Sequence, residues 1–456
     1  MEMAHRDHIL GAVHGVLGAA VLILCLAAEL SVLVLRRHAA LYLLPVCAML
    51  THLWRSGRRA GIGLVDFAYL KPPRRLRVTI PGLLEHLRLI GCFDDGSVEF
   101  MSRVVEDSGM GDETYFPPAL HYLPPSATHA DAVQEAGMLF FPTLDELFAK
   151  TGVPPSAVGA LLVNCSGFGP APSLAAIIAN RYRMPTDVKT FNLSGMGCAA
   201  GIVGVDVARS VLRAHAGAVD YAVVVSAEIV TIGWYRGRDR SKLLPHRMRR
   251  RATVEHRIGG SAGQEDDEGI TGFTIGRGLD RVFRDLLRAH LTAFGASILP
   301  WHEKLRYAAA LARFRRRRRS SKKVQGGEGH VEAPRPNFLA AASHFCLPSS
   351  GMPNIRRLAE GLGLGEREAE AALATFQRFG NQSAASLWYQ LGYHEARGRV
   401  RQGDRVWQLG IGSGPKASSA LWERVAAYGG AAAADEGPWG DCVVRYPARA
   451  PGAPLA

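Results

Sequence analysis

The first sixty residues of the chain have a different hydrophobic pattern from the rest. Residues 9–28 are almost free of polar side chains, and the apolar character resumes as far as Leu35. About twenty apolar residues are needed to span a bilayer, so the pattern predicts a transmembrane helix; a cleaved signal peptide, the alternative, usually has an apolar core of about 7–15 residues. A second apolar run, at 41–53, is interrupted by Pro45 and His52 and predicts a marginal second span.

Basic residues follow these apolar runs directly: Arg55, Arg58, Arg59, Lys71, Arg74 and Arg75. Positive charge beside a membrane span is typical of the cytosolic side. We therefore expect the bulk of the chain to lie in the cytosol.

Further along the chain, short apolar runs alternate with helical patterns. The runs 158–164, 188–193 and 221–226 are typical of buried strands, and the segments between them carry apolar residues at helical spacing. A later run, 406–414, predicts a strand that leads into a glycine turn. Strands that alternate with helices form parallel βαβ units, so the pattern predicts an α/β protein.

One glycine-rich turn in this region carries a candidate nucleophile. Cys198 stands between the strand 188–193 and a helix predicted from Ala199 to Ala214. At a helix N-terminus the unpaired N–H groups and the helix dipole favour the thiolate, the form of cysteine that attacks electrophiles. Small neighbouring residues would let a substrate carbonyl approach the sulfur. A buried structural cysteine is the alternative, and the local sequence does not decide between them.

The cysteines as a set argue against two other kinds of site. The chain has 456 residues, enough for about three average domains or one large duplicated one, and seven cysteines without CxxC spacing. This pattern predicts neither a disulfide scaffold nor a metal site. Cys165, which ends another strand, has no glycine turn around it and is interpreted as a core thiol.

The net charge of +13 suits an anionic partner but does not select one. The densest basic run, Arg313 with Arg315–Arg319, has no interleaved aromatic residue beyond Phe314 and accompanies no nucleic-acid-binding motif, so no nucleic-acid partner is expected. We interpret this run as a solvated loop, with contact to lipid or to acyl-CoA phosphate as the alternative.

A series of motifs runs in order from about Val65 to Trp422. They are Val65-Asp-Phe-Ala68, Gly111-Asp-Glu-Thr-Tyr115, Pro117-Pro-Ala-Leu-His-Tyr122, Asn164-Cys-Ser166, Pro172-Ser-Leu174, Asn192-Leu-Ser-Gly-Met-Gly-Cys198, Asp239-Arg-Ser-Lys-Leu-Leu-Pro245, Arg378-Phe-Gly-Asn381, Ser386-Leu-Trp-Tyr389, Gly403-Asp-Arg-Val-Trp-Gln408 and Gly412-Ser-Gly414. This series, with the apolar N-terminus, resembles the plant 3-ketoacyl-CoA synthases, the membrane-bound condensing enzymes of very-long-chain fatty acid elongation.

The resemblance implies a thiolase-like fold of two similar α/β halves, with the active site between them. We place a membrane anchor at 1–60, the first half at 61–270, the second half at 271–430 and a flexible tail, rich in alanine, glycine and proline, at 431–456. It also implies a homodimer in the endoplasmic reticulum membrane, with the catalytic part in the cytosol and with other elongase subunits as partners.

The same resemblance implies the chemistry. Cys198 would take the acyl group from a long-chain acyl-CoA, and decarboxylation of malonyl-CoA would supply the enolate that attacks it. Asn381 would hydrogen-bond the malonyl thioester carbonyl, and the turn Gly412-Ser413-Gly414 would lie beside the cysteine and offer oxyanion donors. The coenzyme A thioesters are substrates, and no cofactor is implied.

Two departures from the family pattern bear on activity. The family carries a histidine, the partner of the asparagine, where this chain has Pro348, and proline can neither donate a hydrogen bond nor move a proton. His344, four positions earlier, could take over part of this work or be structural. The resemblance also indicates that a family segment is missing after Pro245, within 246–263. The alternative function is therefore a catalytically impaired member that regulates active elongase subunits.

Overall fold

The computed structural model describes residues 21–34, 61–237, 239–240, 242–243, 262–274, 279–321, 334–425 and 437–447. The chain divides into two compact units, 1–63 and 64–456. In the first unit, residues 21–34 are helical. Among the described residues, no helix combines the length and the apolar character that a membrane span requires. The rest of the first predicted span and all of 41–53 lie outside the described residues, so both spans stay predictions.

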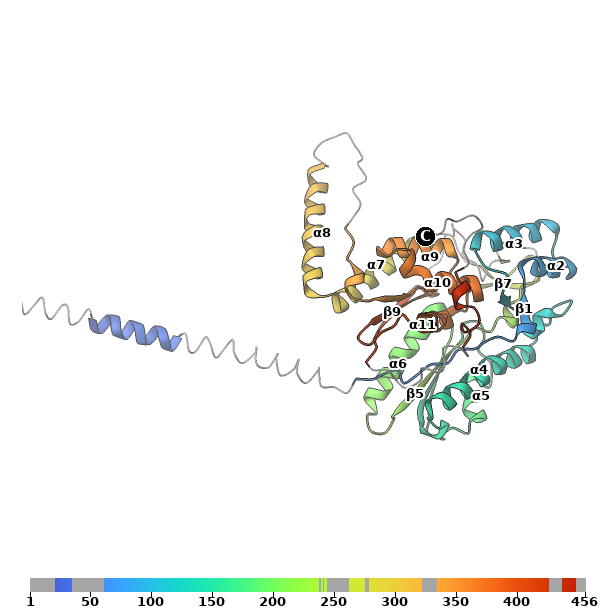
Figure 1. Ribbon diagram of the computed structural model, residues 1–456, viewed down its shortest axis with the longest axis horizontal. Coiled ribbons are helices and arrows are strands. Elements are labelled where there is room, and N and C mark those ends of the chain that lie inside the picture. The colour runs from blue at the N-terminus through green and yellow to red at the C-terminus, as the bar shows by residue number, and fades with distance from the viewer. Residues whose placement is uncertain are drawn as a thin grey trace, which may run out of the picture. The chain divides into compact units, whose positions relative to one another are not determined.

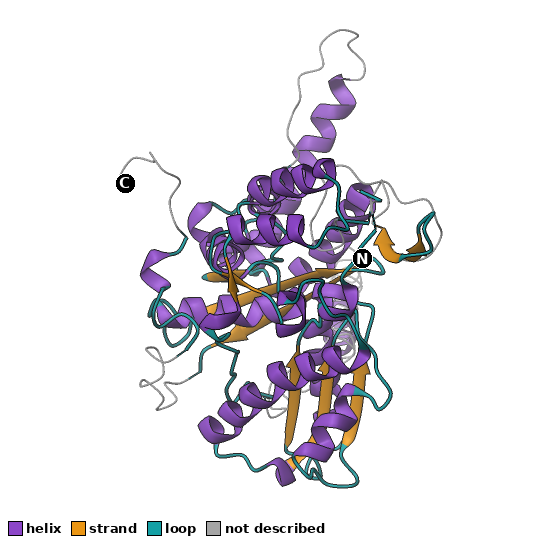
Figure 2. Cartoon of the chain, turned by 90° about the vertical axis from the view of Figure 1, so that its right-hand side faces the viewer, coloured by secondary structure: helices purple, strands orange, loops and turns teal. Residues whose placement is uncertain are grey.

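The alternation of strands and helices predicted for the first half is confirmed. Strands β3 (Val158–Asn164), β4 (Lys189–Leu193) and β5 (Tyr221–Ser226) form a parallel sheet in the order β4-β3-β5. Strand β3 is the buried central strand. Because side chains alternate between its two faces, it packs on helices from both sides. Figure 2 shows the strands in orange with helices packed against them.

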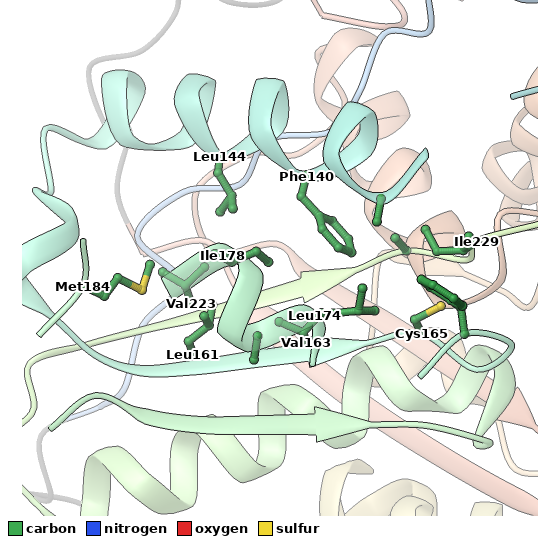
Figure 3. Packing of buried hydrophobic residues seen from close by; sticks show 14 of the residues in the cluster. Phe140, Leu144, Leu161, Val163, Cys165, Leu174, Ile178, Met184, Val223 and Ile229 are labelled. Atoms are coloured by element: carbon green, nitrogen blue, oxygen red, sulfur yellow. The ribbon is translucent and has the colours of Figure 1, made fainter. Parts of the chain in front are cut away.

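The two faces of this sheet are covered by different helices. Leu161 and Val163 of β3 pack against α4 (His129–Thr151) and α5 (Leu174–Arg181), as Figure 3 shows. Leu162, one position along, packs against α6 (Ala200–Ala214) on the other face. Successive side chains of β3 point to opposite faces of the sheet. Helix α6, which follows Cys198, therefore lies on the face opposite to α4 and α5.

The second half contains another three-stranded sheet. Strand β9 (Arg405–Gly412) lies between β8 (His344–Cys346), which is parallel to it, and β10 (Lys416–Glu423), which is antiparallel. One face packs on α7 (Leu279–Ile298), α9 (Met352–Leu362) and α10 (Glu366–Phe379). The other face packs on α11 (Ser386–Ala396) and on Ile202 of α6. Helices α6 and α11 therefore lie between the two sheets (Figure 1).

The remaining elements surround this layered centre. The described ones are β1 (Arg77–Val78), α2 (Ile80–Leu89), α3 (Asp95–Ser108), β2 (Thr114–Tyr115), β6 (Ala262–Glu265), β7 (Thr271–Thr274) and α8 (Trp301–Ser321). The basic run that we interpreted as a loop lies in helix α8, so that interpretation is wrong. Almost all of 246–263, where the resemblance indicates a missing segment, lies outside the described residues.

Part of the tail is packed, in contrast to the flexible tail predicted for 431–456. Trp439 and Cys442 are fully buried in a cluster with Phe379, Tyr389 and Tyr393. The Trp439 indole Nε1 also donates a hydrogen bond of 2.8 Å to the Tyr389 carbonyl. Composition alone predicts a frayed end, but the buried Trp439 with its hydrogen bond, and the Tyr446 hydroxyl bound to Glu113, help to hold residues 437–447 against the core.

We expect Trp439→Phe to lower the free energy of unfolding by about 1–3 kcal/mol, because it leaves a small cavity and removes the hydrogen bond from the indole to the Tyr389 carbonyl. Chemical denaturation of the purified protein measures this change. Val444→Ala is the control, since Val444 lies in the same tail but is 79% exposed. A Trp439→Phe protein as stable as the control would contradict this packing.

Candidate active site

Cys198 lies in a glycine turn between β4 and α6, as the sequence predicts. A short 3-10 helix, η4 (Gly197–Ala199), carries the cysteine and leads directly into α6. The turn needs glycine at Gly195 and Gly197, whose φ angles are +69° and +57°, in the left-handed region that other residues rarely adopt. The Cys198 side chain is half-buried.

The second predicted glycine turn, Gly412-Ser413-Gly414, lies against the first one. A Cβ on Gly412 would stand 1.9 Å from the Met196 carbonyl oxygen, so only glycine fits there. The Ser413 hydroxyl donates a hydrogen bond of 3.0 Å to the Gly195 carbonyl. The end of β9 is thus brought beside the cysteine, where the resemblance places it. That the N–H groups of Gly412-Ser413-Gly414 donate hydrogen bonds to an oxyanion stays a prediction.

The state of the thiol differs from the expectation. Burial raises the pKa of Cys198 to about 11; hydrogen bonding to Ser383 opposes this shift, and the negative charge of Glu228 adds to it. The helix N-terminus was expected to favour the thiolate, but removal of the sulfur from water acts in the opposite direction and is the larger effect. The thiol is therefore protonated at neutral pH, and acylation requires a group that accepts its proton.

Asn381 belongs to the segment that reaches the cysteine. It follows α10, and its Oδ1 accepts a hydrogen bond of 2.8 Å from the N–H of Ser383 at the start of η7 (Ser383–Ala385). Helix η7 packs against η4, which carries Cys198. The Asn381 side chain is exposed. Its hydrogen bond to the Ser383 N–H stabilises this turn. Its bond to a malonyl carbonyl stays a prediction.

His344 is placed away from the cysteine. It starts β8 opposite Val406, and its Nε2 pairs with Asp404 Oδ2 at 3.0 Å. Gly410, whose Cβ would lie 2.9 Å from the Cys198 carbonyl oxygen, is four residues further along β9, or about 13 Å at about 3.3 Å per residue. This geometry favours the structural role for His344.

Along the direction of β8, Pro348 is counted to be nearer to the cysteine than His344 is. Cys346 pairs with Gln408, so continuing the β8–β9 register by two residues brings Pro348 level with Gly410. Pro348 is buried. By this count the position where the family has its histidine lies nearer to the cysteine along the strand direction than His344 does, and a proline there supplies no group that could accept a proton.

Glu228 and Ser383 are site residues that the sequence analysis missed. Glu228 follows β5, and its carboxylate accepts hydrogen bonds from the N–H groups of Ser166 (3.1 Å) and Gly167 (2.7 Å). Interaction with Ser383 opposes the rise in pKa of both the Glu228 carboxyl and the Cys198 thiol. The sequence did offer one sign of Glu228: it is an acidic residue two positions after a predicted strand. Functional groups gather at the carboxyl edge of a parallel sheet.

A buried ion pair holds the segment that carries Asn381 and Ser383. The Arg378 Nε lies 3.3 Å from Glu113 Oε2, and Arg378 Nη2 donates a bond of 2.7 Å to the Tyr115 hydroxyl. Arg378 and Glu113 belong to two separate motifs of the sequence series. The structure brings these motifs together at the end of α10.

The sequence matches two family models. Residues 54–262 match the model described as FAE1/Type III polyketide synthase-like protein, and residues 340–424 match that of the 3-oxoacyl-[acyl-carrier-protein] synthase III C terminal. The 3-ketoacyl-CoA synthase 6 of Arabidopsis thaliana is 38% identical over 415 residues, which cover 85% of this chain and 80% of that protein. The 3-ketoacyl-CoA synthase 4 of the same plant is 37% identical over 426 residues, 86% and 78% of the two chains.

Solved structures share the fold at low sequence identity. CsyB complexed with CoA-SH superposes with a TM-score of 0.56 at 15% identity, over 80% of this chain and 100% of that one. Tetrahydroxynaphthalene synthase of Streptomyces coelicolor, a type III polyketide synthase, gives 0.52 at 18%, over 79% and 98%. These structures support the predicted thiolase-like α/β fold. The relatives above show that the chain belongs to the plant-type 3-ketoacyl-CoA synthase family, the acyltransferases that perform the condensing step of very-long-chain fatty acid elongation.

Proposed function

We propose that this chain is itself an active condensing enzyme, which joins a long-chain acyl-CoA to malonyl-CoA with Cys198 as the acyl carrier. The observation that supports this proposal is the position of Cys198, in a glycine turn where the end of β9 and the segment after α10 converge on it. A thiol with backbone N–H groups and a hydroxyl around it has the components that acyl transfer requires.

The proposed reaction has two halves. The Cys198 sulfur first displaces coenzyme A from the acyl thioester. Malonyl-CoA then loses carbon dioxide, and the resulting enolate attacks the acyl carbonyl and expels the Cys198 thiolate as 3-ketoacyl-CoA forms. Asn381 would hydrogen-bond the malonyl thioester carbonyl, and N–H groups of Gly412-Ser413-Gly414 would receive the developing oxyanion.

The cellular setting is part of the same proposal. The apolar segment 9–35 and the basic residues that follow it support an endoplasmic reticulum anchor with the remaining chain in the cytosol. Membrane lipid, other elongase subunits and a second copy of the chain are the proposed partners. Protease protection of the chain in sealed microsomes would test this orientation.

A product assay tests the activity. Microsomes that contain the full chain are incubated with malonyl-CoA and a long-chain acyl-CoA, and mass spectrometry measures the 3-ketoacyl product two carbons longer. We expect this product above the level of microsomes without the chain. Absence of product across a range of acyl lengths would refute the proposal.

One observation favours a second candidate function, a silent family member that regulates active elongase subunits. Burial raises the pKa of the Cys198 thiol, and this chain carries Pro348 where the family has a histidine. If no other group removes the thiol proton, the first half-reaction would not proceed.

Pro348→His separates the two functions. If the chain is active with another proton acceptor, we expect acylation of Cys198 to change by less than about threefold; a silent member should gain about 100-fold or more, the usual size of general base catalysis. The label that Cys198 retains from radioactive acyl-CoA measures acylation. Pro348→Ala is the control, because it removes the proline ring without adding an imidazole.

A further inference from the structure

The tail segment 437–447 contacts the last residue of α10 through a buried tryptophan. The rings of Trp439 and Phe379 meet edge to face, with their centroids 5.0 Å apart. Trp439 is fully buried, and its Nε1 donates a hydrogen bond of 2.8 Å to the Tyr389 carbonyl in α11. Trp439 therefore connects the tail both to the end of α10 and to α11.

A second contact joins the tail to the buried ion pair at the end of α10. The Tyr446 hydroxyl donates a hydrogen bond of 2.7 Å to Glu113 Oε2, the same oxygen that lies 3.3 Å from Arg378 Nε. The Tyr446 carbonyl accepts hydrogen bonds from the Tyr393 hydroxyl (3.0 Å) and from Arg397 Nη2 (3.1 Å). Both ends of Tyr446 are thus bound, and its hydroxyl is held in place on the Glu113 carboxylate.

The chain that leaves α10 leads directly to the cysteine. It turns at Gly380, whose φ of +74° is in the region that other residues rarely adopt, and Asn381 follows. The Ala384 carbonyl oxygen lies 3.2 Å from the place where a Cβ on Gly201 would stand. Because Gly201 is in the first turn of α6, just after Cys198, the segment 380–385 reaches from the end of α10 to the nucleophile.

We propose that Trp439 and Tyr446 are positioning residues for the condensation. They fix the end of α10 and, through the segment 380–385, the place of Asn381 relative to Cys198. A displacement of about 1 Å at a reacting group can cost about 100-fold in rate, so support of this kind affects catalysis without touching the substrate. The inference rests on the proposed function in taking Asn381 as the group that binds the malonyl thioester carbonyl.

The arrangement around Glu113 explains why the tail is needed. Arg77 binds Oε1 of this carboxylate, whereas Arg378 lies beside Oε2. The tail adds two groups, the Arg445 guanidinium 3.6 Å from Oε1 and the Tyr446 hydroxyl on Oε2. The Tyr446 bond holds Oε2 toward Arg378. Without it, the carboxylate would be free to turn toward the arginines on Oε1, and the end of α10 would lose part of its support.

Amide hydrogen exchange in the full chain tests this coupling without an activity assay. Tyr446→Phe keeps the ring but removes the hydroxyl, so amides of 380–385 should exchange about tenfold faster, as expected for the loss of one hydrogen bond to a charged group. Those of β3 should keep the wild-type rate. Tyr182→Phe is the matched control, because the Tyr182 hydroxyl also binds a carboxylate, that of Asp145, at 2.7 Å. Wild-type exchange of 380–385 in Tyr446→Phe would overturn the proposal.

Product formation in two backgrounds separates positioning from a merely structural role. Tyr446→Phe should lower the yield of 3-ketoacyl product about tenfold when Asn381 is present. In an Asn381→Ala background the same change should lower it less than about twofold, because a residue that acts through Asn381 has no further effect once that side chain is gone. A general loss of structure would lower the yield equally in both backgrounds, and that result would overturn the positioning role.

Trp439→Phe provides a second test that does not depend on Tyr446→Phe folding. It weakens the other contact of the tail with the end of α10, so 380–385 should again exchange faster and the product yield should fall, at temperatures where circular dichroism shows a folded protein. Val444→Ala, at an exposed position of the same tail, should match the wild type. Wild-type exchange and yield in Trp439→Phe would contradict the proposal.

The two proposals can fail separately. Faster exchange of 380–385 in the tail variants, with no condensation product from the wild type, would refute the synthase activity and leave the coupling between tail and segment intact. A yield that falls in Asn381→Ala but not in Tyr446→Phe or Trp439→Phe would refute the positioning role and leave the synthase activity standing.

Discussion

Replacing Cys198 by alanine is expected to reduce formation of the 3-ketoacyl product by at least about 1000-fold. The sulfur carries the acyl group between the two half-reactions, and alanine offers no nucleophile in its place. The surrounding glycine turns do not depend on the side chain, because the Gly412–Met196 approach and the Ser413–Gly195 hydrogen bond involve backbone atoms of the turn. The free energy of unfolding should therefore change by only about 1 kcal/mol or less.

Mass spectrometry of the product and of the acylated protein measures both consequences. Cys92→Ala is the control, since Cys92 is a partly exposed cysteine on the loop between α2 and α3. This variant should retain the wild-type rate within about twofold. An equal yield from Cys198→Ala and the wild type would contradict the assignment of Cys198 as acyl carrier.

Replacing Arg378 by methionine is expected to lower the free energy of unfolding by about 3–5 kcal/mol. The guanidinium is 5% exposed, and it binds the Glu113 carboxylate, the Glu113 carbonyl and the Tyr115 hydroxyl. Methionine keeps similar bulk but leaves these groups without this partner in a buried place. The loss is large against the roughly 5–15 kcal/mol that stabilise a typical protein.

The same variant should affect activity. Arg378 begins the segment that carries Asn381 and Ser383 to the cysteine, so a shift at the end of α10 would move the Ser383 hydroxyl. A displacement of about 1 Å can cost about 100-fold in rate. Acylation should therefore fall even at temperatures where circular dichroism shows Arg378→Met to be folded.

The stability difference between wild type and Arg378→Met should depend on pH. Partial burial alone would raise the pKa of Glu113, but the Tyr446 hydroxyl and the guanidinium groups of Arg378, Arg445 and Arg77 hold it below its ordinary value. A lowered carboxyl pKa stabilises the fold above the unfolded pKa, and this contribution is lost as pH falls through the folded pKa. The difference should thus be largest at neutral pH and shrink in acid.

Denaturation with urea at pH 7 and in acid measures this dependence. Arg356→Met is the matched control, because Arg356 pairs with Glu366 at 2.7 Å but 45% and 67% of their side chains are exposed. Exposed ion pairs contribute about 0–1 kcal/mol. A loss in Arg378→Met no larger than in this control would show that the buried pair does not hold the segment.

The sequence by itself determined the α/β class and predicted the nucleophile. Strand 158–164 and the helix after Cys198 could be predicted because apolar periodicity is a local property of the chain. The glycine turn could also be predicted from the glycines themselves. The structure shows why they are needed, since Gly195 and Gly197 have positive φ angles that other residues rarely adopt. The order of motifs then pointed to the family and to the turn at Gly412.

Only the tertiary structure decided the protonation state of the cysteine and the residues that surround it. The pKa of Cys198 depends on how much water is removed from the sulfur, which no local pattern reports. Glu228 and Ser383 meet it from segments far apart in the sequence, whereas His344, close to the family motif, lies at the distant end of its strand. Burial and long-range contact are properties of the folded chain, and for this reason the acid–base chemistry of the site had to be taken from the structure.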